Sequence, residues 1–383
     1  MDLVLSEEQA AVRRLAADFV DREIVPHAAE WDRAEQVDPT VVRRLGQLGL
    51  LGLTIPEADG GVGGDHLTYC LVTEELGRGD SSIRGIFSVS LGLVGRSIAG
   101  YGTDDQRQRW LPALCAGEAL GCFGLTEPEA GSDAASLTTR AVAVGDRWRL
   151  TGSKTFITNG STAKVALIFA RTGEAGPKGI TAFLVPTDSP GFAATEIHGK
   201  LGLRGQATAQ LTLDEVEVPA SAQLGELGQG FTIAMNALAK GRLSLAAGCV
   251  GILQGCLTAA VEYAKVRHQF GRPIAGFQLV QQLLAEIAMA TDAARLLVWR
   301  AADLIDRGEP FETEASIAKL YASEAAVRAA NSALQVFGGY GYVDEYPVGK
   351  YLRDARVTTV YEGTSQIQQL IIGRALTGVS AFR

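Results

Sequence analysis

A single carboxylate stands in the segment YEGTSQIQ, residues 361–368, just before an apolar stripe that predicts a helix. Ser365 and Gln368 have the spacing of a capping box, so we expect Glu362 to lie just before the helix N-terminus. Backbone N–H groups point outward there and can hold polar ligand atoms. Glu362 is therefore either a functional carboxylate or an acid that only offsets the helix dipole.

An arginine that could answer this carboxylate lies on an apolar helix face. Arg242 follows Leu238 by four residues and precedes Leu245 by three, which predicts that it shares their face. Its guanidinium either turns inward, where it needs a carboxylate, or extends along the face to water.

Three other segments could bind a ligand, although each also has a purely structural explanation. The loop LTEPEAGSD (125–133) could present N–H groups to a phosphate or carbonyl, or be a tight connection. The stretch RHQFGRPIAGFQ (267–278) pairs an arginine with an aromatic ring, which suits a diphosphate and a planar group, or is a solvated helix end. In FGGYGY (337–342) glycines allow close backbone approach, but they do not form a Rossmann GxGxxG motif.

Composition excludes several classes of function. The net charge of −8 without a basic segment argues against nucleic acid as a partner. The five cysteines are scattered and the four histidines isolated, which argues against a zinc site or a Ser-His-Asp triad. We see no signal-peptide pattern and no apolar stretch of the ~18 residues needed to cross a membrane, so we expect a cytoplasmic protein without a membrane anchor.

The elements that must position these residues fall into three regions, expected at 1–119, 120–224 and 225–383. The first shows helical patterns near 6–25, 39–50, 66–79, 83–101 and 104–117. The second has short Val-, Ile-, Thr- and Phe-rich runs with no helical pattern between them, which favours an antiparallel barrel or sandwich over a parallel βαβ sheet. The third returns to long helices near 230–265, 277–307 and 312–337, typical of a bundle.

Taken together and in order, these segments resemble the acyl-CoA dehydrogenase family over essentially the whole chain. The matching stretches are IPEADGGVGG, LTEPEAGSD, GSKTFITNG, LGLRG, LGQGF, RHQFGRPIAGFQ, QVFGGYGY and RDARVTTVYEGTSQIQ. The resemblance implies a helical N-terminal domain, a middle β domain and a C-terminal four-helix bundle. It also implies FAD bound between the last two and shared across the interface of a homo-oligomer, usually a tetramer.

The resemblance carries cofactor and substrate roles onto particular positions. Residues implied to line the flavin are Phe123, Leu125, Thr126, Gly131, Ser132, Phe156 and Thr158. Those implied to hold the diphosphate and adenosine from a neighbouring subunit are Arg267, Phe270, Gln278, Gln335 and Gly339, and those completing the cofactor contacts are Thr364 and Gln366. Those implied to contact the acyl thioester are Ser132, Arg242, Tyr361 and Gly363.

By the same resemblance Glu362 is the catalytic base, which takes the α-proton of an acyl thioester while hydride leaves the β-carbon for flavin N5. Arg242 would orient this base. Some family members carry the base immediately before that arginine, where this chain has Gly241, so Glu362 is left as the base. The expected electron acceptor is an electron-transferring flavoprotein.

Two positions depart from the commonest family pattern. Phe156 replaces a tryptophan and keeps an aromatic platform, whereas Ala239 replaces an aspartate in a segment that helps to bind CoA. The second departure leaves three hypotheses: an acyl-CoA dehydrogenase, which is favoured, a dehydrogenase or oxidase of an acyl group tethered to an acyl carrier protein, and a thioester-binding scaffold without activity. Acyl chain length is not fixed by the sequence, because it depends on how residues such as Ser88 face the cavity.

Overall fold

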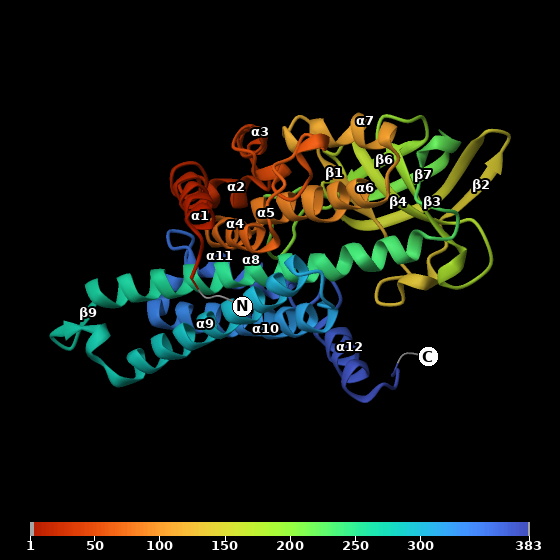
Figure 1. The fold of residues 1–383 in the computed structure, drawn as a ribbon. Coiled ribbons are helices and arrows are strands. Elements are labelled where there is room, and N and C mark those ends of the chain that lie inside the picture. Colours follow the sequence, from red (N-terminus) through yellow and green to blue (C-terminus); the bar gives the residue numbers. More distant parts are fainter. Residues whose placement is uncertain (1–3, 382–383) are drawn as a thin grey trace.

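A computed structural model describes residues 4–381 of the chain; helices form the N-terminal and C-terminal regions of the sequence, and a β-sheet forms the middle region (Figure 1). The N-terminal helices, coloured red to orange, pack along the long helix α8 (Gly230–Val266), and the sheet lies at one end of the molecule. This order of helices, strands and helices confirms the fold class expected from the sequence.

The N-terminal region is helical where the patterns predicted helices. Ser6 and Gln9 form the expected capping box of the first helix, with each side chain bonded to the other residue's backbone N–H. The stretch expected at 83–101 is helical, but Ser88–Gly95 is a π-helical segment, which interrupts the regular α-helix. The helices are α1 (Glu7–Phe19), α2 (Ala28–Ala34), α3 (Pro39–Gln47), α4 (His66–Gly79), α5 (Ser81–Phe87), α6 (Arg96–Tyr101) and α7 (Asp104–Cys115).

The middle region forms one eight-stranded sheet in the order β6-β7-β3-β2-β4-β5-β8, with β1 paired to β4. Most neighbouring strands are antiparallel as expected, but β1 and β2 both pair with β4 in parallel, which the sequence did not predict. No helical crossover joins these parallel pairs, because the chain returns through the β2–β3 hairpin between β1 and β4 and through β3 between β2 and β4. The strands are β1 (Gly121–Gly124), β2 (Arg140–Val144), β3 (Arg147–Thr158), β4 (Val165–Arg171), β5 (Ile180–Pro186), β6 (Phe192–Glu196), β7 (Thr208–Pro219) and β8 (Gln223–Leu224).

The C-terminal region is a bundle in which α8, α9 (Gln278–Asp306) and α10 (Glu312–Phe337) pack together, as expected. A small hairpin of β9 (His268–Gln269) and β10 (Arg272–Pro273) joins the first two. Two shorter helices, α11 (Val348–Val357) and α12 (Ser365–Thr377), pack against α10.

The central helix α8 corrects one expectation. Within the described residues, Gly230–Val266 is long and apolar enough to cross a membrane, with a mean hydropathy of 1.7 over its best 18-residue window, so the statement that no stretch reaches that length is wrong. Of that window, 72% is buried inside the molecule, because N-terminal helices cover one side of α8 and the bundle covers the other. Burial in a core accounts for the apolar composition of this helix.

Candidate active site

A cavity of about 790 Å³ lies where the three regions meet. Its walls come from the helical stretch that begins at Ser81, from the β domain, from the N-terminal half of α8 and from the turn that precedes α12. The cavity brings together most of the residues that were expected to contact the flavin or the thioester. They are Phe123, Leu125, Thr126, Gly131, Ser132, Phe156, Thr158, Arg242, Tyr361, Glu362 and Gly363.

Glu362 occupies a turn whose backbone is held from behind. Its φ of +56° lies in the left-handed region, which costs a non-glycine residue free energy and needs support from its surroundings. Gln368 Nε2 donates to the carbonyl oxygens of Glu362 and Gly363, each at 3.0 Å, and Lys319 Nζ donates to Gly363 O at 2.7 Å. These bonds fix the turn and leave the carboxylate facing the cavity.

The capping box expected at Ser365 and Gln368 is wrong. Thr364 is the N-cap of α12, and its hydroxyl accepts from the N–H of Ile367. Ser365 is the first helical residue and donates to Glu324, while Gln368 supports the turn around Glu362. The prediction was out of register by one residue, because threonine and serine are adjacent and both are good caps.

The carboxylate of Glu362 lies in an environment that favours its protonated form. Burial raises its pKa to about 7, and the charges of Arg242, Arg84 and Lys319 oppose that rise. Its Oε2 atom is buried without a hydrogen-bond partner. No acceptor within residues 4–381 bonds the Glu362 N–H either, so a carboxylate and a free N–H donor lie side by side.

Arg242 lines the same cavity but does not pair directly with Glu362. Its side chain is half-buried, and its Nε has no hydrogen-bond partner in the described chain. No ion pair within 4.0 Å joins the two residues, so Arg242, which the resemblance assigns to orienting the base, does not contact Glu362 directly. The two residues interact at longer range, because the charge of Glu362 raises the pKa of Arg242. Burial has a larger and opposite effect, so the net shift in the pKa of Arg242 is downward.

Gly241 leaves room for the carboxylate of Glu362. A Cβ added to this glycine would lie 2.7 Å from Oε2 of Glu362 and 3.0 Å from Cδ2 of Leu93. The carboxylate of Glu362 thus occupies the space that a side chain at position 241 would enter.

The loop at 125–133 is anchored by a buried ion pair. Lys154 Nζ lies 2.7 Å from Oε1 of Glu127 and 3.2 Å from the carbonyl oxygen of Leu125, and both charged side chains are buried. Glu127 also accepts from the backbone N–H groups of Thr138 and Thr139. The pair ties the start of the loop to β3, which carries Phe156 and Thr158.

Phe156 supplies an unburied aromatic wall. It lines the cavity, it is 70% exposed, and its φ of +57° is unusual for an aromatic residue. Two residues later on β3, Thr158 Oγ1 accepts from Nε2 of Gln206 at 3.2 Å, and Oε1 of Gln206 is buried without a hydrogen-bond partner in the described chain. An open aromatic face beside an unsatisfied polar atom fits a planar heterocycle.

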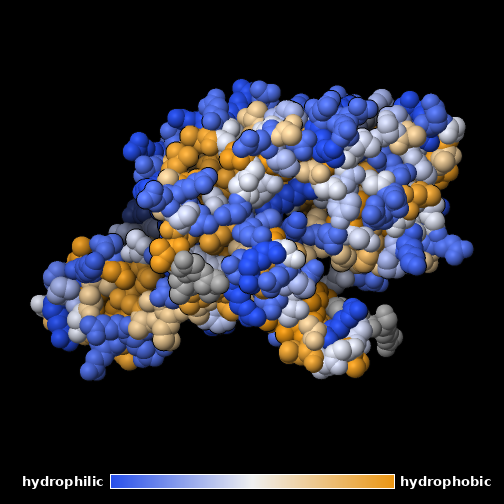
Figure 2. All heavy atoms as spheres, viewed as in Figure 1, coloured by the Kyte–Doolittle hydropathy of each residue, from blue (hydrophilic) through white to orange (hydrophobic). Residues whose placement is uncertain are grey.

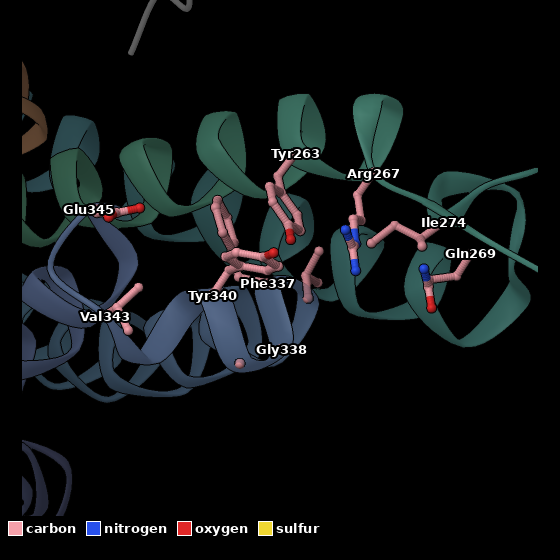
Figure 3. A pocket seen from close by; sticks show the side chains of 11 residues that line it. Tyr263, Arg267, Gln269, Ile274, Phe337, Gly338, Tyr340, Val343 and Glu345 are labelled. Carbon is pink, nitrogen blue, oxygen red and sulfur yellow. The ribbon is translucent and has the colours of Figure 1, made fainter.

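The remaining predicted cofactor residues do not reach this cavity. Arg267 and Gly339 line a second hollow at the far end of the bundle, where Arg267 lies 5.3 Å from the ring of Tyr340 (Figure 3). Arg267 is about 35 to 40 Å along α8 from Arg242, so the two hollows form separate sites within one chain. The other predicted residues outside the first cavity are Phe270, which is 92% exposed, and Gln278, Gln335, Thr364 and Gln366.

Sequence reasoning missed several polar residues of the cavity. Arg84 lines it and is almost wholly buried, and Gln206 lines it beside Thr158. Lys319, fully buried in α10, supports the Glu362 turn from outside the lining. Arg84 is the only charged residue in the apolar run 81–95, and that isolation was the signal that could have found it.

Comparisons with known proteins agree along the whole chain. Three family profiles match: the acyl-CoA dehydrogenase N-terminal domain at residues 6–118, the middle domain at 122–216 and the C-terminal domain at 228–377. The human mitochondrial short-chain specific acyl-CoA dehydrogenase is 44% identical over 96% of this chain and 90% of its own length.

Solved structures give the same result. A chain from a structural study of the electron transferring flavoprotein of Acidaminococcus fermentans matches with a TM-score of 0.97 and 41% identity, covering 98% of this chain and all of the other. A glutaryl-CoA dehydrogenase from Mycobacterium smegmatis in complex with FADH2 matches with a TM-score of 0.95 and 36% identity, covering 99% and 97%.

Proposed function

Because this chain belongs to the acyl-CoA dehydrogenase family, an FAD-dependent family of oxidoreductases, we propose that it oxidises the α,β carbon–carbon bond of an acyl-CoA thioester with Glu362 as the base. The observation that carries this assignment is the pairing in one residue of a buried carboxylate oxygen and a free backbone N–H, both unbonded, at the wall of the cavity. A proton acceptor and an oxygen-binding donor are the two groups that α-proton removal from a thioester requires.

The residues of the cavity fit the flavin of FAD. Phe156 offers an open aromatic face, and Thr126, Ser132 and Thr158 offer small polar groups on the same wall. Bound FAD would accept the hydride that leaves the β-carbon of the substrate.

Glu362 would take the α-proton on its unbonded Oε2. With a pKa near 7, the carboxylate is a stronger base than an ordinary glutamate, whose usual value is 4.5. The N–H of the same residue would donate to the thioester oxygen, where negative charge develops as the proton leaves. Lys319 and Gln368 hold both groups in place through the carbonyls of the turn.

The test compares Glu362→Gln with Glu312→Gln, since Glu312 is another glutamate of the cavity wall. Anaerobic mixing of flavin-loaded enzyme with butyryl-CoA would report flavin bleaching. We expect the Glu362 variant to remain yellow and to react at least ~10³-fold more slowly, because the general base is lost. The control should keep most of its rate, and a Glu362 variant of normal rate would refute the assignment.

The carrier of the acyl group is a second question that Ala239 raises. This residue lines the cavity and is buried, so a methyl group stands where many family members have a carboxylate. We therefore propose acyl-CoA first and an acyl-carrier-protein thioester second. If an acylated carrier protein bleaches the bound flavin and the CoA thioester of the same acyl group does not, that order is reversed.

We further propose that the protein works as a homo-oligomer and passes electrons to an electron-transferring flavoprotein. Apolar surface gathers over the helical bundle (Figure 2). Leu279 and Met289 on α9 and Leu376 on α12 are each more than two-thirds exposed. A second copy would cover this surface and bring Arg267 to the first cavity. Light scattering after gel filtration tests the assembly, and dye reduction through added flavoprotein tests the acceptor.

A further inference from the structure

Arg84 is a buried cation in the cavity without an acid to neutralise it. Only 4% of the residue is exposed, yet it contributes to the cavity wall. Its Nη2 donates to the hydroxyl of Tyr361, and that is the only hydrogen bond its guanidinium makes to residues 4–381. No described carboxylate lies within 4.0 Å of it. A buried guanidinium normally pairs with an acid, because leaving its charge uncompensated is costly.

Comparison with a neighbouring arginine shows that Arg84 is distinguished by its place in the cavity wall. Arg96, in the same helical stretch, is half-buried and has no ion pair within residues 4–381, but its guanidinium lies 4.4 Å from the ring of Tyr69 and bonds Thr54. It does not line the cavity. Arg84 lies 5.9 Å from the ring of Tyr361, and unlike Arg96 it can receive a ligand.

The position of Arg84 marks the inner end of the acyl site. The α8 residues that line the cavity run from Phe231 to Arg242, whereas Arg84 packs farther along, with its Cδ 2.7 Å from the place of a Cβ on Gly248. Glu362 packs in the same way on Gly241. Both side chains therefore lie over one face of α8, two turns or about 10 Å apart.

This spacing limits the chain that could join the two groups. A contact of ~3 Å at the carboxylate of Glu362 and another at Arg84 leaves roughly 4 Å for the carbons between the reacting α-carbon and a distal group. Only a short acyl chain fits that length.

The surroundings of Arg84 suit an anion. Ser88, one helical turn later, lines the cavity, and its Oγ accepts from Ser244, which is bonded in turn to the hydroxyl of Tyr69. With its acceptor side occupied, the Ser88 hydroxyl can donate its own hydrogen to a ligand. The charges of Arg84, Arg242 and Lys319 all act on Glu362. Glu312 also acts on Arg242 and Glu324 on Lys319, whereas among the described carboxylates Arg84 has only its share of Glu362.

Resting on the function proposed above, we propose that the preferred substrate is a short dicarboxylic acyl thioester, whose distal carboxylate binds Arg84 and Ser88. The thioester end lies beside Glu362, and the carboxylate supplies the acid that Arg84 lacks. The alternative is that Arg84 serves only to position Tyr361.

The first experiment uses the unmodified flavin-loaded enzyme. We would compare kcat/KM for glutaryl-CoA with that for the thioester of its neutral monomethyl ester and for butyryl-CoA. We expect kcat/KM for glutaryl-CoA to exceed that for the monomethyl ester by about 100-fold, because the ester removes the charge that would pair with the buried guanidinium. If butyryl-CoA is oxidised well and glutaryl-CoA poorly, this proposal fails and the dehydrogenase function stands. If no acyl-CoA bleaches the flavin, the function itself fails.

The second experiment asks whether Arg84 causes the preference. Arg84→Gln should lower the ratio of glutaryl-CoA to butyryl-CoA kcat/KM by about 100-fold, and Arg96→Gln, the matched control, should leave this ratio unchanged. An equal loss on both substrates would show that Arg84 only positions Tyr361 and would overturn the proposal. Calorimetric binding of glutaryl-CoA to Glu362→Gln, with and without Arg84→Gln, measures the affinity without turnover. If the Arg84 variants do not fold, the substrate panel on the unmodified enzyme still decides the matter.

Discussion

The pKa of Glu362 makes a direct prediction about how activity depends on pH. The base must be ionised to accept a proton, and burial raises its pKa from 4.5 to about 7. With a single ionisation near 7, about 99% of the carboxylate is charged at pH 9 and about 1% at pH 5. The rate constant kcat/KM, which reports the free enzyme, should therefore fall about 100-fold from pH 9 to pH 5.

The assay is stopped-flow reduction of the bound flavin under anaerobic conditions, at low substrate concentration and constant ionic strength. A substrate deuterated at the α-carbon would confirm that proton removal limits the rate across the range. The sign is fixed by the chemistry, since activity must rise with pH through the pKa of a general base. A profile with its midpoint near 4.5, or one that falls as pH rises through 7, would refute the proposed environment of Glu362.

Three substitutions test the support of the site. Lys319→Met removes a cation that lowers the pKa of Glu362, so the midpoint of the same pH profile should move to higher pH; an unchanged midpoint would contradict this. Gly241→Ala places a methyl group 2.7 Å from the carboxylate oxygen, and we expect at least a ~10-fold loss of flavin reduction rate with little change in melting temperature; a normal rate would show that the turn can yield. Lys154→Met leaves Glu127 buried without its ion-pair partner and should lower the free energy of unfolding by about 3 to 5 kcal/mol, measured by denaturant titration; a loss below 1 kcal/mol would mean that the hydrogen bonds of Glu127 suffice.

Much of the fold could be predicted, because helical and strand periodicities follow from which side chains face a core. The long helices and most strands lie where those periods indicated. The parallel pairing of β1 with β4 could not be predicted, since it depends on how distant strands meet rather than on any local pattern.

The site also has a part that the sequence could predict and a part that it could not. The sequence alone marked Glu362 and Arg242, because a lone charge beside an apolar stripe stands out locally. It did not show that they avoid direct contact, or that Lys319 and Gln368 hold the turn from another helix and from α12. Those facts depend on side chains that the fold brings together over long separations.

The left-handed backbone at Glu362 also bears on how this position tolerates change. Glycine would adopt a φ of +56° freely, whereas a side chain there costs about 1 to 2 kcal/mol. Selection for thermal stability alone would thus favour glycine, and only selection for turnover keeps the glutamate. Stability and activity therefore favour different residues at position 362, so a search for heat-resistant variants that does not select for turnover would favour loss of the base.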